Sequence, residues 1–155
     1  MTEIRDARPE DRDQIVDYNV KLAAESEDMH LDPDTVRRGV EKVLGDPSRG
    51  RYFLAEEGGQ VVGQTMITFE WSDWRCGWFW WIQSVYVAPE ARGHGVFRGL
   101  LQHIMGLARE DAEVCGIRLY VDLDNEAAQK VYERTGLPRA HYEMREVDFH
   151  RADAG

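Results

Sequence analysis

The chain has 155 residues, the usual size of one domain, and we expect a single domain over residues 1–155. Apolar residues make up 43% of the chain and charged residues 31%, and no run approaches the ~20 apolar residues that span a bilayer. The formal net charge of −10 disfavours binding to nucleic-acid phosphates. We therefore expect a cytoplasmic protein with neither a membrane nor a nucleic-acid partner.

Two periods of apolar residues alternate along the chain. Apolar positions three or four residues apart indicate helices, and runs rich in β-branched and aromatic residues indicate strands. In chain order we expect a strand over Glu3–Ala7, a helix from Pro9 through Ala23, a helix from Asp32 to Gly45, strands over Arg51–Glu57, Gln60–Glu70 and Trp78–Val87, a helix from Val96 to Ala112, a strand over Ile117–Val121, a helix capped by Asp124 or Asn125 and ended by Gly136, and a last strand over His141–Phe149. This order predicts a mixed α/β fold, with one mostly antiparallel sheet flanked by about four helices.

Cysteine and histidine give no metal or redox signature. Cys76 and Cys115 are too few for a disulfide framework, and neither belongs to a C-x-x-C pair. The five histidines lack the spacing of metal ligands. We expect no metal.

A glycine-containing loop, Arg92-Gly93-His94-Gly95-Val96-Phe97, joins a strand to a helix. Such a loop directs free backbone N–H groups and the positive end of a helix at an anion, typically a phosphate. The glycines permit positive φ, and Arg92 adds a planar set of donors. The loop matches neither the ATP-binding nor the NAD-binding glycine pattern.

Two segments carry a family resemblance. The run Val85-Tyr86-Val87-Ala88-Pro89-Glu90-Ala91-Arg92-Gly93-His94-Gly95-Val96-Phe97 resembles the central motif of GNAT-type N-acetyltransferases, R/Q-x-x-G-x-G/A after a strand, which binds the pyrophosphate of CoA. The run from Asp124 to Leu137 is similar to that family's second motif, N-x-x-A-x-x-x-Y-x-x-x-G-F. The resemblance implies that acetyl-CoA lies between the strand ending at Val87 and the strand ending at Val121, where the sheet splays.

The resemblance also implies roles for individual residues. Backbone groups of Val85 and Val87 would pair with the pantetheine arm, and the Val85 amide would polarise the thioester carbonyl. Tyr132 would protonate the departing thiolate, although on its residue type alone it could equally be a core tyrosine. The implied cofactor contacts are Val85, Tyr86, Val87, Arg92, Gly93, His94, Gly95, Val96, Phe97, Arg98, Asn125, Ala128 and Tyr132.

Phe97 departs from the family pattern, which has Gly or Ala at this position. A bulky side chain leaves the backbone N–H in place, and Val96, Leu100 and Leu101 offer an apolar neighbourhood. We expect the ring to turn into the core between helix and sheet, and acetyl-CoA binding to be retained.

The acceptor side has no motif. An amine must lose a proton before it attacks a thioester, and the candidate bases are the carboxylates Glu70, Asp73, Glu25 and Glu27. Trp80, Trp81 and Gln83 are candidate acceptor contacts, in a hairpin that holds all five tryptophans. The same tryptophans would equally suit a strand buried in the core or in a homodimer contact.

Two functions follow. The first is transfer of acetyl from acetyl-CoA to a primary amine of a small molecule or a protein, without a covalent enzyme intermediate. The second is a catalytically inactive acyl-CoA-binding or sensing module on the same fold.

Overall fold

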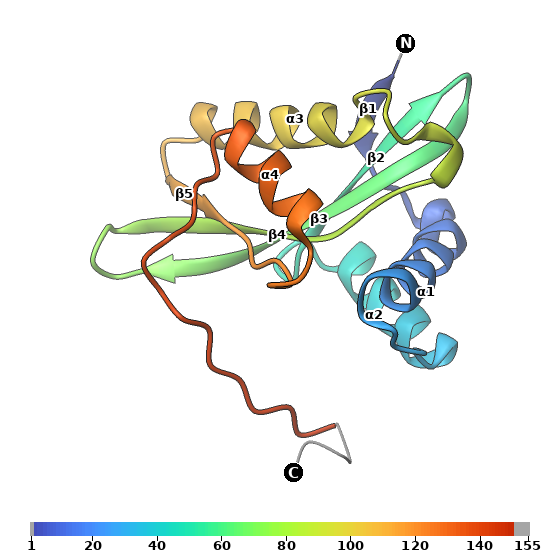
Figure 1. The fold of residues 1–155 in the computed structure, drawn as a ribbon, viewed down its shortest axis with the longest axis horizontal. Helices are drawn as coiled ribbons and strands as arrows, with labels where there is room; N and C mark the ends of the chain where they lie inside the picture. The colour runs from blue at the N-terminus through green and yellow to red at the C-terminus, as the bar shows by residue number, and fades with distance from the viewer. Residues whose placement is uncertain (1, 151–155) are drawn as a thin grey trace.

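A computed structural model of the chain describes residues 2–150, which form a five-stranded sheet and four α-helices (Figure 1). The strands are β1 (Glu3–Asp6), β2 (Arg51–Glu57), β3 (Gln60–Ser72), β4 (Gly77–Val87) and β5 (Val114–Arg118). The helices are α1 (Arg12–Glu27), α2 (Pro33–Gly45), α3 (Val96–Glu110) and α4 (Glu126–Arg134), with short 3-10 turns η1 (Pro9–Asp11) and η2 (Pro89–Ala91).

The sheet order is β1-β2-β3-β4-β5, with the first four strands antiparallel and β5 parallel to β4. Gly58 and Gly59 form the β2–β3 turn, and both have positive φ (57° and 78°), which a two-residue hairpin turn favours. The mostly antiparallel sheet flanked by four helices is therefore confirmed.

The two faces of the sheet carry different helices, and alternation along β2 shows why. Phe53 packs in a cluster with Leu100 and Ile104 of α3, whereas its neighbours Tyr52 and Leu54 pack with Ile15 of α1 and Val40 of α2. Neighbouring residues on a strand face opposite sides, so one strand contributes to both cores. In Figure 1, α3 and α1–α2 accordingly lie on opposite sides of the sheet.

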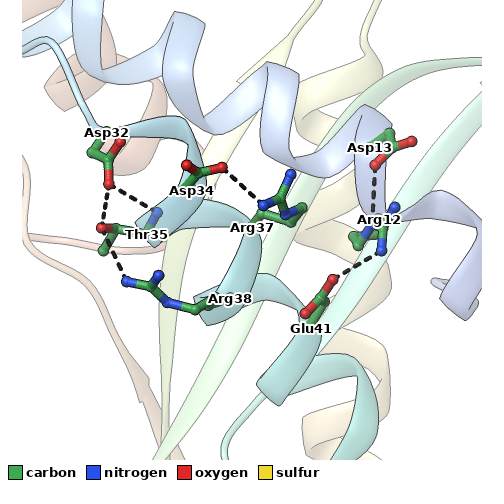
Figure 2. Close-up of polar contacts among 8 residues, drawn as sticks. All are labelled: Arg12, Asp13, Asp32, Asp34, Thr35, Arg37, Arg38 and Glu41. Atoms are coloured by element: carbon green, nitrogen blue, oxygen red, sulfur yellow. Dashed lines mark hydrogen bonds and ion pairs between the residues drawn. The ribbon is translucent and has the colours of Figure 1, made fainter.

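Polar contacts at the surface orient α1 and α2 (Figure 2). Asp32 caps α2, since its carboxylate accepts from the Thr35 amide at 3.2 Å and the Thr35 hydroxyl at 2.7 Å. The Arg12 guanidinium of α1 donates to the Glu41 carboxylate of α2 at 2.8 Å. The cap is internal to α2, and the Arg12–Glu41 pair bridges the two helices at their exposed surface.

The fifth strand lies three residues earlier than expected, at Val114–Arg118 instead of Ile117–Val121. Its pairing with β4 begins where Val114 stands opposite Trp78, beside a hydrogen bond from the Trp78 amide to the Glu113 carbonyl. Leu119, Tyr120 and Val121, which the prediction placed in the strand, follow Arg118 after β5 has left the sheet.

The last predicted strand, His141–Phe149, is wrong. This segment contains no strand and runs away from the sheet (Figure 1). Its apolar residues change face midway: Tyr142 and Met144 share one parity, Val147 and Phe149 the other. A strand with that pattern has no single apolar face to bury, and these four side chains are exposed.

No helix among residues 2–150 is both long enough and apolar enough to cross a membrane.

Candidate functional site

The sheet opens between β4 and β5. The two strands are in register only from Trp78 to Trp81 on β4, and β5 ends at Arg118, whereas β4 continues to Val87. The edge of β4 from residue 82 to 87 that would face β5 therefore has no paired strand. This is the predicted splay, and it exposes backbone groups that an extended ligand can pair with.

A β-bulge lies within this open part of β4. Tyr86 pairs with Gln64 and Gln83 pairs with Met66, so Ser84 and Val85 together oppose Thr65 alone. Ser84 has φ of 52°, an uncommon value for a residue other than glycine. Val85 consequently has no partner in the β3–β4 register.

The phosphate loop follows β4 through η2. Gly93 and Gly95 have φ of 81° and 84°, which confirms the positive φ expected at both positions. Gly95 precedes the first residue of α3, and the Gly99 amide is bonded to the Gly95 carbonyl at 2.9 Å. The amides of the intervening residues, 96 to 98, have no partner within the helix and lie at its positive end.

This loop fits an anionic group. A Cβ added at Gly93 or Gly95 would meet no atom within 4 Å, so the space at both glycines is open. His94 and Arg98 are exposed beside the free amides. Open space, unpaired amides and a guanidinium are what a pyrophosphate needs.

Arg92 lies across the base of the loop. Its Nε donates to the Val87 carbonyl at 2.9 Å, its Nη2 pairs with Glu25 Oε2 at 2.9 Å, and its guanidinium stands 5.4 Å from the Tyr86 ring centroid. Glu25 also accepts from the Tyr86 hydroxyl at 3.1 Å. The Arg92 hydrogen bond is the main reason that the pKa of Glu25 lies below its usual value. Glu25 of α1 is thus connected to the phosphate loop.

Tyr132 of α4 faces α3. Its ring centroid is 5.5 Å from that of Phe97, and both side chains pack against the core beneath α3. The ring of Phe97 therefore does turn into the core, as expected. Burial raises the pKa of Tyr132, and its hydroxyl makes no hydrogen bond with the part of the chain that the structure describes.

Asn125 has a structural task in α4. Its side-chain oxygen accepts from the Ala128 amide at 3.1 Å, which caps the helix. Gly136, with φ of 90°, follows the helix end as predicted.

The acceptor candidates do not converge on Val85. Glu70 stands opposite Phe79, six residues along β4 from Val85, which corresponds to about 20 Å. Its Oε1 accepts from Arg118 at 2.8 Å and from the Trp81 indole at 3.2 Å. Gln83 is closer to Val85, and its amide donates to the Thr68 hydroxyl at 2.6 Å.

The five tryptophans separate into exposed and buried members. Trp74 is 87% exposed and Trp71 50%, at the tip of the β3–β4 hairpin, whereas Trp80 is buried in the α3-side core. They do not line one pocket.

Sequence reasoning missed several residues at the bulge. The Gln64 side chain on β3 donates to the Asn19 side chain on α1 and to the Ser84 carbonyl on β4, and the Thr65 hydroxyl donates to the Gln83 carbonyl. The available signal was the polar pair Gln64-Thr65 between the apolar pairs Val61-Val62 and Met66-Ile67.

A sheet that splays at the end of one strand, beside a glycine loop and a helix N-terminus, has the shape and the free backbone groups that suit a phosphate-bearing ligand with an extended arm. The model of the acetyltransferase (GNAT) family matches residues 12–137. The chain belongs to the acetyltransferase (GNAT) family, and fold and family together place it among the acyltransferases.

Solved structures agree on the fold. A possible acetyltransferase from Clostridium difficile 630 is 41% identical, with a TM-score of 0.90, and the match covers 96% of this chain and 97% of that one. A predicted acetyltransferase from Clostridium acetobutylicum, solved with acetyl-CoA, has the same fold at 21% identity, with a TM-score of 0.77 and 96% of each chain covered.

Curated relatives match over shorter stretches. N-alpha-acetyltransferase 40 of Saccharomyces cerevisiae is 39% identical over 66 residues, which are 39% of this chain and 23% of that protein. Mycothiol acetyltransferase of Streptomyces bingchenggensis is 37% identical over 110 residues, 64% of this chain and 32% of that protein. The match thus spans a third or less of the length of these two relatives.

Proposed function

We propose that this protein transfers an acetyl group from acetyl-CoA directly to a primary amine. The observation that carries the proposal is the continuity of two features: the open edge of β4 around Val85 leads directly into the glycine loop and the free amides of α3. An extended thioester with a pyrophosphate at its other end has the same two parts in the same order.

The backbone would hold most of the donor. Amides from Gly93 to Arg98 would bind the pyrophosphate, with His94 and Arg98 beside it, and the edge of β4 at Val85 and Val87 would pair with the pantetheine arm. Acetyl-CoA supplies the acetyl group as an activated thioester. Arg92 would reach the phosphates only by sharing or leaving its pair with Glu25.

Two groups of the chain would act on the reacting atoms. The Val85 amide, which lies in the bulge where the β3–β4 register is interrupted, would donate to the carbonyl oxygen as negative charge develops on it. The Tyr132 hydroxyl would give its proton to the sulfur as the bond between sulfur and acyl carbon breaks. This hydroxyl is protonated at neutral pH, because the ordinary pKa of tyrosine lies near ~10 and burial raises the pKa of Tyr132 further.

The acceptor would be a small-molecule amine or an amine of a protein. A net charge of −10 suits a cationic acceptor. Glu70 lies too far along β4 to deprotonate an amine beside Val85, so proton loss to a water chain or to Glu25 or Glu27 is the better proposal. The exposed Trp71 and Trp74 favour a contact with another chain, such as a homodimer, over an acceptor pocket.

The second candidate function is an inactive acyl-CoA-binding module, which the same loop and edge would serve. Calorimetric titration with acetyl-CoA, CoA and ATP tests what both candidates share. Acetyl-CoA and CoA should bind, and ATP should compete poorly with them. Failure of acetyl-CoA to bind, together with restored binding in Phe97→Gly, would show that the phenylalanine blocks the site.

A further inference from the structure

Two polar side chains are fully buried in residues 2–150, and both lie at the bulge. Gln64 and Thr65 have no exposed surface; Thr65 lies opposite the bulge at Ser84 and Val85, and its neighbour Gln64 pairs with Tyr86. The other buried side chains that the structure describes are hydrophobic. The buried polar pair thus lies at the bulge, where the β3–β4 register shifts.

Hydrogen bonds from both side chains to β4 explain why polar residues lie there. The Gln64 amide donates to the Ser84 carbonyl at 3.1 Å, and the Thr65 hydroxyl donates to the Gln83 carbonyl at 3.2 Å. These are the consecutive carbonyls of β4 at the point where the bulge interrupts the ladder. The Gln64 amide also donates to Asn19 Oδ1 on α1 at 2.8 Å, which fixes its own orientation.

Gln64 and Ser84 each carry a free-energy cost that packing alone does not explain. The Gln64 side-chain oxygen has no hydrogen-bond partner within the described residues, although it is buried. Ser84 adds a second cost, because its positive φ is unfavourable for a residue with a side chain. An apolar residue at position 64 would avoid the first cost, so the two donated hydrogen bonds are what the glutamine provides.

We propose that Gln64 is a positioning residue that holds the β4 bulge in place and thereby sets the direction of the Val85 amide. This inference rests on the proposed function of the Val85 amide toward the thioester carbonyl. The bulge interrupts the β3–β4 register at Val85, Gln64 locks the bulge through Ser84, and Asn19 locks Gln64 to α1.

Replacement of Gln64 by methionine keeps the length and volume of the side chain and removes both donors. In the full chain, we expect Gln64→Met to lower kcat about tenfold or more, because a donor that is displaced slightly loses most of its effect on the transition state. The Kd for CoA without its acetyl group should stay nearly unchanged, since the glycine loop is untouched. Adding Ser84→Gly, which adopts positive φ freely, should recover a large part of the lost kcat.

Tyr52→Phe is the matched control, because it removes a buried hydroxyl that touches Asn19 at 3.3 Å but does not touch β4. A folded Gln64→Met variant with wild-type kcat, or an equal loss of kcat in Tyr52→Phe, would overturn the proposal. If Gln64→Met does not fold, Asn19→Leu is the second variant, because it removes the oxygen on α1 that accepts from the Gln64 amide. It should also lower kcat. An unchanged kcat in Asn19→Leu counts against the proposal.

A crystal structure of Gln64→Met, or of Asn19→Leu, separates this inference from the proposed function. We expect Ser84 to leave the positive-φ region in the variant. An unchanged bulge overturns the role of Gln64 whatever the activity, whereas a wild-type protein that never turns over acetyl-CoA overturns the proposed function and leaves the effect on the bulge to be read from the structure.

Discussion

Tyr132 is the residue whose proposed chemistry can be separated most cleanly from its packing. The change Tyr132→Phe removes one hydroxyl and keeps the ring against Phe97. We expect kcat to fall by about 10²-fold or more because the departing thiolate loses its proton donor, with acetyl-CoA affinity nearly unchanged. Steady-state kinetics under conditions where chemistry limits the rate give the comparison. Near-normal kcat in the folded variant would assign Tyr132 to the core alone.

The pH dependence gives an independent reading of the same hydroxyl. Burial raises the pKa of Tyr132 above the ordinary value near ~10. A general acid works while it is protonated, so its contribution to kcat is complete at lower pH and is lost as the pH rises through the raised pKa. We therefore expect no loss of kcat from Tyr132 between pH 7 and about 9. An alkaline limb within that range that vanishes in Tyr132→Phe would contradict the effect of burial.

At the residue scale, sequence prediction succeeded where a single backbone conformation decides the outcome. The positive φ of Gly93 and Gly95 and the cap at Asn125 follow from local chemistry and were predictable. The pairing of Arg92 with Glu25 was not, because 67 residues separate them and only the packing of α1 beside β4 brings them together.

Among the elements, the join of β1, β2 and η1 depends on one side chain. Arg5 donates to both Asp11 oxygens at 2.8 and 2.9 Å and to Glu56 at 2.8 Å, and its side chain is 20% exposed. We expect Arg5→Met to lower the free energy of unfolding by about 1–3 kcal/mol, since two carboxylates lose their shared partner. Chemical denaturation measures this loss, and Arg12→Met, which breaks only exposed pairs, is the control that should change little.

Acid should reduce that difference. The hydrogen bond from Arg5 lowers the pKa of Asp11, so the contribution of this pair is complete above the ordinary pKa near ~4 and is lost as the pH falls through the lowered value. A gap between wild type and Arg5→Met that stays constant down to pH 2 would contradict this assignment.

Element order was predictable because helix and strand periods differ, but two element boundaries were not. Apart from Arg118, the run from Ile117 to Val121 consists of β-branched, aromatic or other apolar residues, so its composition does not indicate that β5 leaves the sheet at Arg118. The segment from 141 to 149 alternates like a strand but has no constant apolar face. Whether such a segment forms a strand depends on its pairing with a neighbour, which composition does not encode. The splay itself depends on where pairing stops.

The whole molecule combines a core on both faces of the sheet with one open seam, the stretch between β4 and β5 where the two strands no longer pair. The phosphate loop, the bulge and Tyr132 come from segments between residues 64 and 132, and α1 reaches the seam through Glu25 and Asn19. Motifs identified the loop and Tyr132, whereas the contributions of α1 required the fold. The acceptor side, which no motif marks, remains a proposal for the same reason.

The central claim is that an amine-dependent acetyl transfer takes place at this seam. The most direct measurement is release of free CoA thiol from acetyl-CoA in the presence and absence of a panel of small-molecule and peptide amines, with the acetylated product identified by mass. We predict thiol release that depends on the amine, matches the acetylated product mole for mole and drops in Tyr132→Phe. Tight binding of acetyl-CoA with no amine-dependent release across the panel would contradict the account and favour an acyl-CoA-binding module.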